Sequence, residues 1–456
     1  MLSGKKCKLF GTDGIRGKSN SFPIRPDIVL KVGQALGYLL RKNGRNKKMV
    51  LIGKDTRLSG YMLEQALASG LNSMGVWVQL TGPLPTPGIG FLAQNMRAEA
   101  GIVISASHNP YYDNGIKFFD AHGFKMSKTM EEAIEELVFS NKLNKFIVSC
   151  DRIGRSRRID DSAGRYIVHV KNTFPLNMTL DGMRVVLDCA HGACYKVAPK
   201  IFEELGAEVF VIGNKPTGYN INEQTGALHT DKIQQAVLDY KADVGISLDG
   251  DGDRVIMADE KGELVDGDHI LGICALSLQK KGELQCPKVV ATSMSNMGLE
   301  IMLKKKGIQV ERTEPGDRNV VEYMRQNNIS LGGEPSGHII FLSQSTTGDA
   351  CVAALNVLAV MRTENKKLSE LSQVLVPIPQ VQRSVKIKKK KELQTITGYN
   401  EVIEDIKKGL QNKGRICVRY SGTEPIIRVL VEGKDKQFIQ NCADKIAHLL
   451  SRNLNP

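Results

Sequence analysis

The sequence predicts an α/β fold with three related α/β units, whose sheets are mixed but largely parallel, and a smaller C-terminal α+β unit. Three observations lead to this prediction. One strand–helix–strand order occurs three times, each of these helices stops at a glycine, and the section after residue 372 follows another pattern. Strands that alternate with helices at this spacing are typical of parallel sheets.

Each repeated unit starts with an apolar strand and an amphipathic helix. The strands cover 49–55, 184–188 and 288–292, and the helices cover 61–74, 196–205 and 298–306. The helices stop at Gly75, Gly206 and Gly307, and glycine often ends helices because it accepts left-handed backbone angles. A second strand and a Pro-containing loop follow in each unit. The alternative is a chance likeness between ordinary α/β units.

A third strand completes each unit and leads into a polar loop. The strands cover 101–104, 243–248 and 329–331, and the loops that follow cover 105–110, 249–254 and 332–338. Ligands of open α/β sheets bind beyond the carboxyl ends of the strands. We therefore expect these three loops, which occupy corresponding places in the three units, to form the functional site.

The C-terminal section combines a linker with a small α+β unit. Residues 371–382 contain Pro377 and Pro379 and are predicted to be the linker, and a basic stretch follows at 386–391. Helices are expected over 399–410 and 436–450, and strands over 415–419 and 426–431. The expected domains are therefore 1–155, 156–255, 256–372 and 373–456.

Charge and composition narrow the classes of partner. The chain of 456 residues is too long for one core, and its net charge of +13 lies partly in runs at 41–48, 304–306 and 388–391. Such runs are solvated faces or a general attraction for anionic substrates. Aromatic residues make up only 5% of the chain, which weighs against a base-stacking nucleic-acid surface. We expect no nucleic-acid partner.

Cysteine usage and hydropathy predict a cytoplasmic protein. The nine cysteines include no CxxC pair, a pattern that fits reduced thiols better than a disulfide framework or a zinc site. No apolar stretch is long enough to span a bilayer, and the N-terminus leads into no signal-peptide core. We therefore expect no membrane partner.

The second loop is a candidate Mg²⁺ site. Asp249, Asp251 and Asp253 alternate with glycines that let the backbone curl, so that the three carboxylates can converge on one ion. Arg254 beside them suits the charge of a phosphate. A calcium loop is one alternative, because Glu260 falls at its twelfth position, but its sixth position is arginine instead of glycine. A solvated acidic turn is the other alternative.

The C-terminal loop and the third loop are candidate substrate contacts. Glu334, Ser336 and His338 offer groups that suit sugar hydroxyls, although a lone histidine is more often structural. The C-terminal loop combines small residues with two arginines that can bind phosphate bidentately, and a capped hairpin turn is its alternative. This candidate anion cradle comprises Arg419, Ser421, Gly422, Thr423 and Arg428.

Ser107 and Ser105 are equal nucleophile candidates by composition. No GxSxG motif and no recognisable Ser–His–Asp spacing supports acyl transfer. A triple-aspartate site together with a separate phosphate cradle favours phosphoryl transfer to and from a serine. Lys117 follows the serine loop and is a candidate acid or base if its pKa is lowered, the alternative being an exposed lysine on a strand. A glycine-rich loop near the N-terminus adds Thr12, Asp13 and Arg16.

Five motifs taken in order resemble the α-D-phosphohexomutase superfamily. They are Thr12-Asp13-Gly14-Ile15-Arg16-Gly17, Ser105-Ala106-Ser107-His108-Asn109-Pro110, Asp249-Gly250-Asp251-Gly252-Asp253-Arg254, Gly333-Glu334-Pro335-Ser336-Gly337-His338 and Arg419-Tyr420-Ser421-Gly422-Thr423-Glu424-Pro425. The resemblance covers essentially the whole chain and is strongest to a bacterial branch that acts on glucosamine phosphates. Tyr420 and Pro335 depart from what many members carry.

The resemblance implies four domains around a central cleft, phosphorylated Ser107 as the phosphoryl donor, and Mg²⁺ held by the three aspartates and the Ser107 phosphate. It places Lys117, Arg16 and His338 near the transfer chemistry. It assigns Glu334 and Ser336 to sugar hydroxyls and the anion cradle to the non-reacting phosphate.

The implied reaction interconverts glucosamine 6-phosphate and glucosamine 1-phosphate. Glucosamine or glucose 1,6-bisphosphate serves as the intermediate or activator, and the product feeds amino-sugar nucleotide and cell-wall precursor synthesis. A phosphomannomutase/phosphoglucomutase of the same fold, and a non-catalytic sugar-phosphate-binding protein, are the alternatives. A homodimer is left open.

Overall fold

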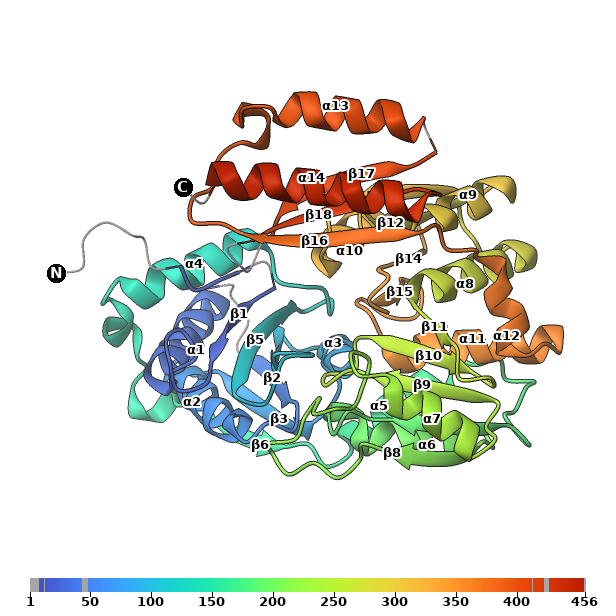
Figure 1. Cartoon of the computed structure of the whole chain (residues 1–456). Helices are drawn as coiled ribbons and strands as arrows, with labels where there is room; N and C mark the ends of the chain where they lie inside the picture. Colours follow the sequence, from blue (N-terminus) through green and yellow to red (C-terminus); the bar gives the residue numbers. More distant parts are fainter. Residues whose placement is uncertain (1–7, 12, 43–47, 412, 422–425, 455–456) are drawn as a thin grey trace.

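The computed structural model describes residues 8–11, 13–42, 48–411, 413–421 and 426–454. Within them the chain forms a six-stranded, a five-stranded, a four-stranded and a three-stranded sheet in chain order. The first unit lies at the lower left and the second at the lower right, the third lies at the right above the second, and the C-terminal unit lies across the top (Figure 1). The predicted fold class is confirmed.

The first sheet has the strand order β1-β5-β4-β2-β3-β6. Its strands are β1 (Ile15–Lys18), β2 (Met49–Lys54), β3 (Trp77–Pro83), β4 (Ala100–Ile104), β5 (Asp113–Asp120) and β6 (Ser156–Arg158). The helices of this unit are α1 (Pro26–Arg41), α2 (Ser59–Ser73), α3 (Thr86–Asn95) and α4 (Lys128–Phe139). Short 3-10 turns follow at Leu143–Phe146 and Cys150–Arg152.

The second sheet has the order β11-β10-β9-β7-β8. Its strands are β7 (Arg184–Asp188), β8 (Glu208–Ile212), β9 (Val244–Leu248), β10 (Val255–Asp259) and β11 (Leu264–Val265). Its helices are α5 (Ser162–Lys171), α6 (Val197–Glu203) and α7 (Asp231–Asp239), with a 3-10 turn at Ala193–Tyr195. The expected domain boundary after residue 255 falls at the first residue of β10, which pairs with β9.

The third sheet has the order β13-β12-β14-β15. Its strands are β12 (Lys288–Thr292), β13 (Gln309–Thr313), β14 (Leu331–Gly333) and β15 (Ile339–Phe341). Its helices are α8 (Gly267–Lys281), α9 (Met297–Lys305), α10 (Asp317–Gln326), α11 (Ala350–Glu364) and α12 (Leu368–Leu371). A 3-10 turn at Ser372–Val374 follows α12.

The three sheets share one plan, which confirms the repeat. The first strand of each unit, β2, β7 or β12, lies between its second and third strands and pairs parallel with both. The third strand then turns back into an antiparallel strand, β5, β10 or β15. The three predicted loops are these three turns. The shared topology therefore places a different set of side chains at the corresponding end of each sheet.

The C-terminal unit holds the antiparallel sheet β16-β18-β17, formed by β16 (Gln380–Lys386), β17 (Arg415–Tyr420) and β18 (Ile426–Glu432). It carries α13 (Tyr399–Leu410) and α14 (Lys436–Leu454), with a 3-10 turn at Leu393–Thr395. β16 begins inside the segment predicted as linker. That part of the prediction is wrong, because Val381 and Val385 are buried in the core and the segment pairs as a strand. The residues between these two valines are polar, so the sequence shows no continuous apolar run here.

Most of the core is continuous between the α/β units, and the C-terminal unit has its own. One apolar cluster runs from Leu84 and Phe119 of the first unit to α11, which is almost entirely buried. A separate cluster packs β16 and β18 against α13 and α14. The C-terminal unit is therefore the part least fixed by shared apolar contacts.

One polar junction joins the C-terminal unit to the third unit. The Glu432 carboxylate, which is fully buried, accepts hydrogen bonds from the Met297 amide at the start of α9 (3.0 Å) and from Gln380 Nε2 (2.6 Å). Arg415 forms an ion pair with it at 2.5 Å and donates to the Ser295 carbonyl at 2.9 Å. Asn296 exchanges hydrogen bonds with the backbone of Ile378 in the linker.

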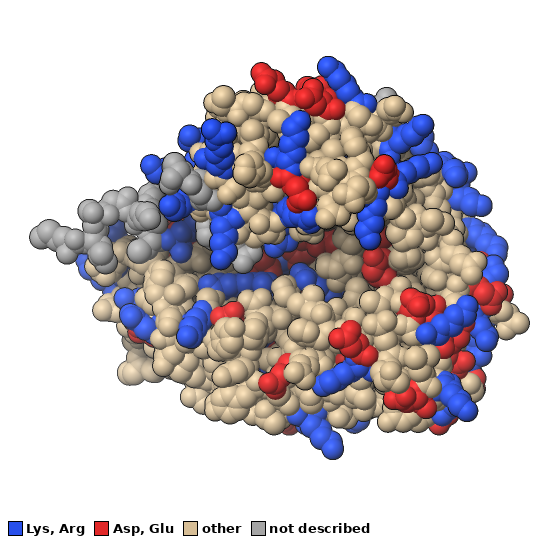
Figure 2. Space-filling view, viewed as in Figure 1, with Lys and Arg blue, Asp and Glu red and all other residues tan. Residues whose placement is uncertain are grey.

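A cleft opens between the C-terminal unit and the α/β units beneath it. Figure 2 shows basic side chains along both rims of this cleft and acidic side chains deeper within it. In the part of the chain that the structure covers, no helix is long and apolar enough to cross a membrane.

Candidate active site

Ser107 stands in the turn after β4, in a backbone conformation that serines rarely adopt. Its φ is +52°, in the left-handed region, and its side chain is 1% exposed. A non-glycine residue in this region is strained and persists only when its surroundings hold it there. The conformation lets the Ser107 hydroxyl donate a hydrogen bond to Asp249 Oδ2 in the turn after β9, at 2.7 Å.

Arg57 holds this strained turn by its carbonyl groups. The guanidinium, which is fully buried, donates to the carbonyls of Ser107 (2.9 Å), Asn109 (2.8 Å) and Asp113 (3.1 Å), and also to that of Pro110. Its Nε bonds Asp55 Oδ2 at 2.7 Å.

Asn222 from the second unit holds the same turn from the other side. Its side-chain amide donates to the carbonyls of Ser107 and Asn109 at 2.9 and 3.0 Å. Neither Arg57 nor Asn222 was predicted from the sequence. The one available signal was the position of Arg57 just after the carboxyl end of β2, where site residues of such sheets lie.

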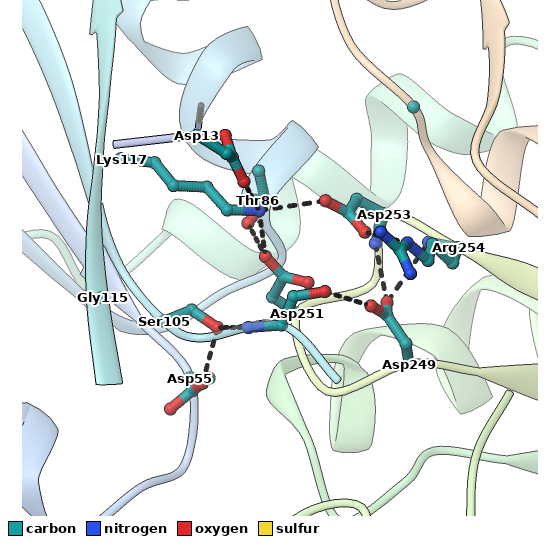
Figure 3. Close-up of polar contacts among 12 residues, drawn as sticks. Asp13, Asp55, Thr86, Ser105, Gly115, Lys117, Asp249, Asp251, Asp253 and Arg254 are labelled. Atoms are coloured by element: carbon teal, nitrogen blue, oxygen red, sulfur yellow. Dashed lines mark hydrogen bonds and ion pairs between the residues drawn. The ribbon is translucent and has the colours of Figure 1, made fainter. Parts of the chain in front are cut away.

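Ser105 has a different task, and the structure separates it from Ser107. The Ser105 hydroxyl donates to Asp55 Oδ2 at 2.6 Å and accepts the Ser107 amide at 2.9 Å. Figure 3 shows Ser105 turned toward Asp55, away from Asp249. Of the two serines, the geometry therefore presents only Ser107 to the acidic loop.

Asp249, Asp251 and Asp253 converge as the sequence predicted. One oxygen of each lies within 4.8 Å of the others, and all three residues are buried. Burial and the other two carboxylates raise the pKa of Asp249 well above its usual value. Asp251 Oδ1 and Asp253 Oδ1 have no hydrogen-bond partner, which is costly for buried oxygens. This donor set fits a hard divalent cation such as Mg²⁺.

A calcium-binding helix–loop–helix does not describe this loop, because strands β9 and β10 flank it. Glu260, the twelfth-position candidate, is bonded instead to Ser369 at 2.5 Å. Arg254 donates its backbone amide to Asp249 Oδ1 at 3.2 Å, and its side chain lies 3.9 Å from Asp253.

Lys117 lies on β5 and points into the aspartate loop (Figure 3). Its Nζ is 2.8 Å from Asp251 Oδ2 and 3.0 Å from Asp253 Oδ2, and the residue is 2% exposed. Burial by itself lowers the pKa of Lys117, but Asp251, Asp253 and Asp13 together raise it well above its usual value. The lowered pKa on which the acid or base role depended is therefore not found, and the alternative of an exposed lysine is wrong.

The N-terminal loop joins the site through Asp13. Arg16 Nη2 bonds Asp13 Oδ2 at 2.6 Å, and Lys117 Nζ lies 3.8 Å from the same oxygen. Lys125 forms ion pairs with Asp13 and with Asp317 of the third unit. Sequence reasoning missed Lys125 and Asp317, and Thr12 lies outside the described residues.

The third loop brings His338 to the same place. His338 is 2% exposed, and its Nδ1 lies 3.8 Å from Asp253 Oδ1. Its Nε2 accepts the Gly348 amide at 3.1 Å, which leaves the ring proton on Nδ1, toward Asp253. Glu334 Oε1 accepts the Gly316 amide at 2.8 Å, and Ser336 donates to Glu334 Oε2 at 3.2 Å.

His108 is a further residue at the nucleophile that sequence reasoning did not single out. Its Nδ1 is 3.3 Å from the Ser107 hydroxyl oxygen. Burial, reinforced by Arg254 and Arg16, lowers the pKa of His108 to about 4, so the imidazole is neutral at pH 7.

The described part of the anion cradle places two arginines side by side. Arg419 and Arg428 are register partners on β17 and β18. Burial and the nearby Arg428 lower the pKa of Arg419, while Glu314 and Glu334 of the third unit act in the opposite direction. Two like charges at one place fit a doubly charged phosphate. Ser421 is buried next to them, whereas Gly422 and Thr423 lie outside the described residues.

Four models of the phosphoglucomutase/phosphomannomutase family match successive parts of the chain. The α/β/α domains I, II and III match residues 7–145, 164–262 and 266–377, and the C-terminal domain matches 362–449. The chain belongs to this family.

Curated relatives of this phosphoglucomutase/phosphomannomutase family member cover nearly its full length. Phosphoglucosamine mutase of Bdellovibrio bacteriovorus is 59% identical over 99% of this chain and 100% of its own length. Phosphoglucosamine mutase of Geotalea uraniireducens is 52% identical over 98% of both chains.

Solved structures show the same fold. A phosphoglucomutase/phosphomannomutase family protein from Burkholderia thailandensis has a TM-score of 0.80 at 21% identity, over 98% of this chain and 97% of that one. The Aspergillus fumigatus N-acetylphosphoglucosamine mutase in complex with GlcNAc-6P and magnesium has a TM-score of 0.67 at 17% identity, over 98% and 96%.

Arg57→Met is expected to lower turnover by about a hundredfold, because the Ser107 turn loses its main backbone donors. It also leaves Asp55 buried without its cation, which costs about 3–5 kcal/mol of stability. Steady-state kinetics and thermal unfolding check both effects. Arg25→Met, at an exposed ion pair, is the matched control. Wild-type turnover in Arg57→Met would show that the guanidinium does not hold the turn.

Proposed function

We propose that this phosphosugar mutase interconverts glucosamine 6-phosphate and glucosamine 1-phosphate through a phosphoserine at Ser107 and a 1,6-bisphosphate intermediate. The observation that carries the proposal is the Ser107 hydroxyl, held in a left-handed turn and hydrogen-bonded at 2.7 Å to a buried triple-aspartate site. Relatives at 59% and 52% identity with this name support the choice of substrate.

The reaction consists of two phosphoryl transfers. In the first, the bond between phosphorus and the Ser107 oxygen breaks, and a bond to the free sugar hydroxyl forms. The resulting 1,6-bisphosphate reorients within the cleft and returns its other phosphate to Ser107. Water has to be excluded during this reorientation, since it would hydrolyse the phosphoserine. The separate apolar core of the C-terminal unit supports a role in opening and closing the cleft.

Asp249, Asp251, Asp253 and the Ser107 phosphate would hold Mg²⁺. When bound, Mg²⁺ neutralises charge that develops on the transferring phosphoryl group. Arg16, Arg254 and Lys117 add fixed positive charge around the same point. The nearby carboxylates raise the pKa of Lys117, which keeps its ammonium group charged, so Lys117 would act as an electrostatic stabiliser. His338 lies beside the same ligands, with its Nδ1 3.8 Å from Asp253 Oδ1.

The other end of the substrate would lie against the third and fourth units. Glu334 and Ser336 are assigned to sugar hydroxyls, and the anion cradle (Arg419, Ser421, Gly422, Thr423 and Arg428) to the non-reacting phosphate. A structure of the Aspergillus fumigatus enzyme variant with glucose 1,6-bisphosphate supports such an intermediate or activator here.

The remaining assignments follow from the family and the fold. We place the enzyme in the cytoplasm, where it supplies amino-sugar nucleotide and cell-wall precursor synthesis. Its domain boundaries lie after β6, after β11 and before β16, since each sheet is complete there.

Ser107→Ala is expected to abolish both turnover and the phosphate adduct, while Ser105→Ala keeps the adduct. The physical reason is that only Ser107 faces the aspartate loop, whereas Ser105 bonds Asp55. Intact-mass measurement after incubation with glucose 1,6-bisphosphate checks this. An adduct that survives Ser107→Ala, or is lost only in Ser105→Ala, would place the phosphate on the other serine.

A substrate panel separates the mutases of this fold. We expect kcat/KM for glucosamine 6-phosphate to exceed that for glucose and mannose 6-phosphates by at least about tenfold, the selectivity that one well-placed polar contact provides. Coupled assays on the three sugars measure the ratios. Highest efficiency on mannose or glucose phosphate would favour the phosphomannomutase/phosphoglucomutase alternative. No turnover of any sugar would favour the non-catalytic binding protein.

A further inference from the structure

A buried ion pair joins the first and third units at a distance in sequence from every motif described above. Arg318, the second residue of α10, donates to Glu131 in the first turn of α4 through Nη1 (3.1 Å) and Nη2 (2.5 Å). Arg318 is 8% exposed and Glu131 is 5% exposed. Because both terminal nitrogens are bonded to Glu131, Arg318 is not arranged to bind substrate phosphate.

Further contacts join the first and third units at the same interface. The Thr346 hydroxyl donates to the Gly123 carbonyl at 2.6 Å, and the Arg325 guanidinium lies 3.9 Å from the centre of the Phe124 ring. Lys125 forms its ion pair with Asp317 between them. Residues 123–131 of the first unit are therefore fixed against α10 and Thr346 of the third.

Stability does not explain why a charged pair is buried here. Removing two charges from water costs about as much as their attraction returns, so an apolar pair of similar size would serve stability equally well. A bidentate arginine–carboxylate pair differs from apolar contacts in its fixed geometry.

The residues just before Arg318 lead directly to the active site. Gly316 donates its amide to Glu334, the candidate sugar-reading carboxylate, at 2.8 Å. Asp317 binds Lys125, which binds Asp13 beside Lys117 and Arg16. The start of α10 thus touches both the sugar loop and the charged network around the nucleophile.

We propose that Arg318 and Glu131 are positioning residues that set the start of α10, and through it Glu334 and Lys125, for the reaction. The proposal rests on the proposed function, since it assigns the pair an effect on turnover. The pair leaves Ser107, its turn and the aspartates untouched. We therefore expect the pair to act on the rates of phosphoryl transfer to and from the sugar, and not on the phosphoserine content that the protein reaches at equilibrium.

The decisive variant replaces both charges, E131M/R318M, because an apolar pair keeps the interface filled. We expect its Tm to stay within about 3 °C of wild type and its phosphoserine content to be unchanged. Its kcat on glucosamine 6-phosphate should fall about tenfold to a hundredfold, with KM within about threefold, as a misplacement of about 1 Å produces. Hydrogen exchange over residues 312–318 should rise.

Arg318→Lys is the second variant, and it keeps the charge but loses the bidentate geometry. It should fold, and its kcat should lie between that of wild type and the double variant. Arg165→Met, at the exposed pair with Asp161 on α5, is the matched control and should behave as wild type.

The proposal fails if E131M/R318M or Arg318→Lys turns over at the wild-type rate, since the pair would then serve stability alone. It also fails if phosphoserine content falls in step with kcat, or if exchange over 312–318 does not change. Failure of the proposed function looks different. Wild type would then turn over no glucosamine phosphate. The exchange measurement would still show whether the Arg318–Glu131 pair fixes residues 312–318.

Discussion

The left-handed turn at Ser107 is the feature on which the rest of the site depends. A serine would leave this conformation if the turn were free, because its side chain clashes with the backbone there. Arg57 and Asn222 hold the turn by its carbonyl groups, one from each of two units. Ser107, the proposed nucleophile, is thereby placed at the junction of two sheets, where its hydroxyl donates a hydrogen bond to Asp249.

Equivalent topology explains how the other groups arrive at the same point. Each α/β unit turns from its third strand into an antiparallel strand, and contacts between these turns bring them together. The first turn carries Ser107, the proposed nucleophile. The second carries the three aspartates, and the third carries the residues proposed to contact the sugar. The charges are then balanced across units: Lys117 of the first faces two aspartates of the second, and Lys125 of the first faces Asp317 of the third.

The sequence allowed the fold class and the main loops to be predicted because those depend on local patterns. Apolar runs, helices that end at a glycine, and alternating aspartates can each be recognised within a short stretch of sequence. β16 was not predicted, since an edge strand with only Val381 and Val385 buried has too little apolar signal.

Residues that act over long sequence separations were also missed. Arg57 and Asn222 bind backbone carbonyls far along the chain, and such contacts leave no motif. The direction in which the pKa of Lys117 shifts could not be predicted, because the carboxylates that raise it lie more than a hundred residues away. Electrostatics of this kind depends on which units face each other, and no single window of sequence contains that information.

The central proposal is that a phosphate on Ser107 and the three aspartates share one divalent cation. A crystal structure of the phosphorylated protein grown with Mn²⁺, with anomalous data, tests this directly. We expect one strong anomalous peak coordinated by Asp249, Asp251, Asp253 and a phosphate oxygen on Ser107. A peak elsewhere, or a phosphate carried by Ser105, would contradict it.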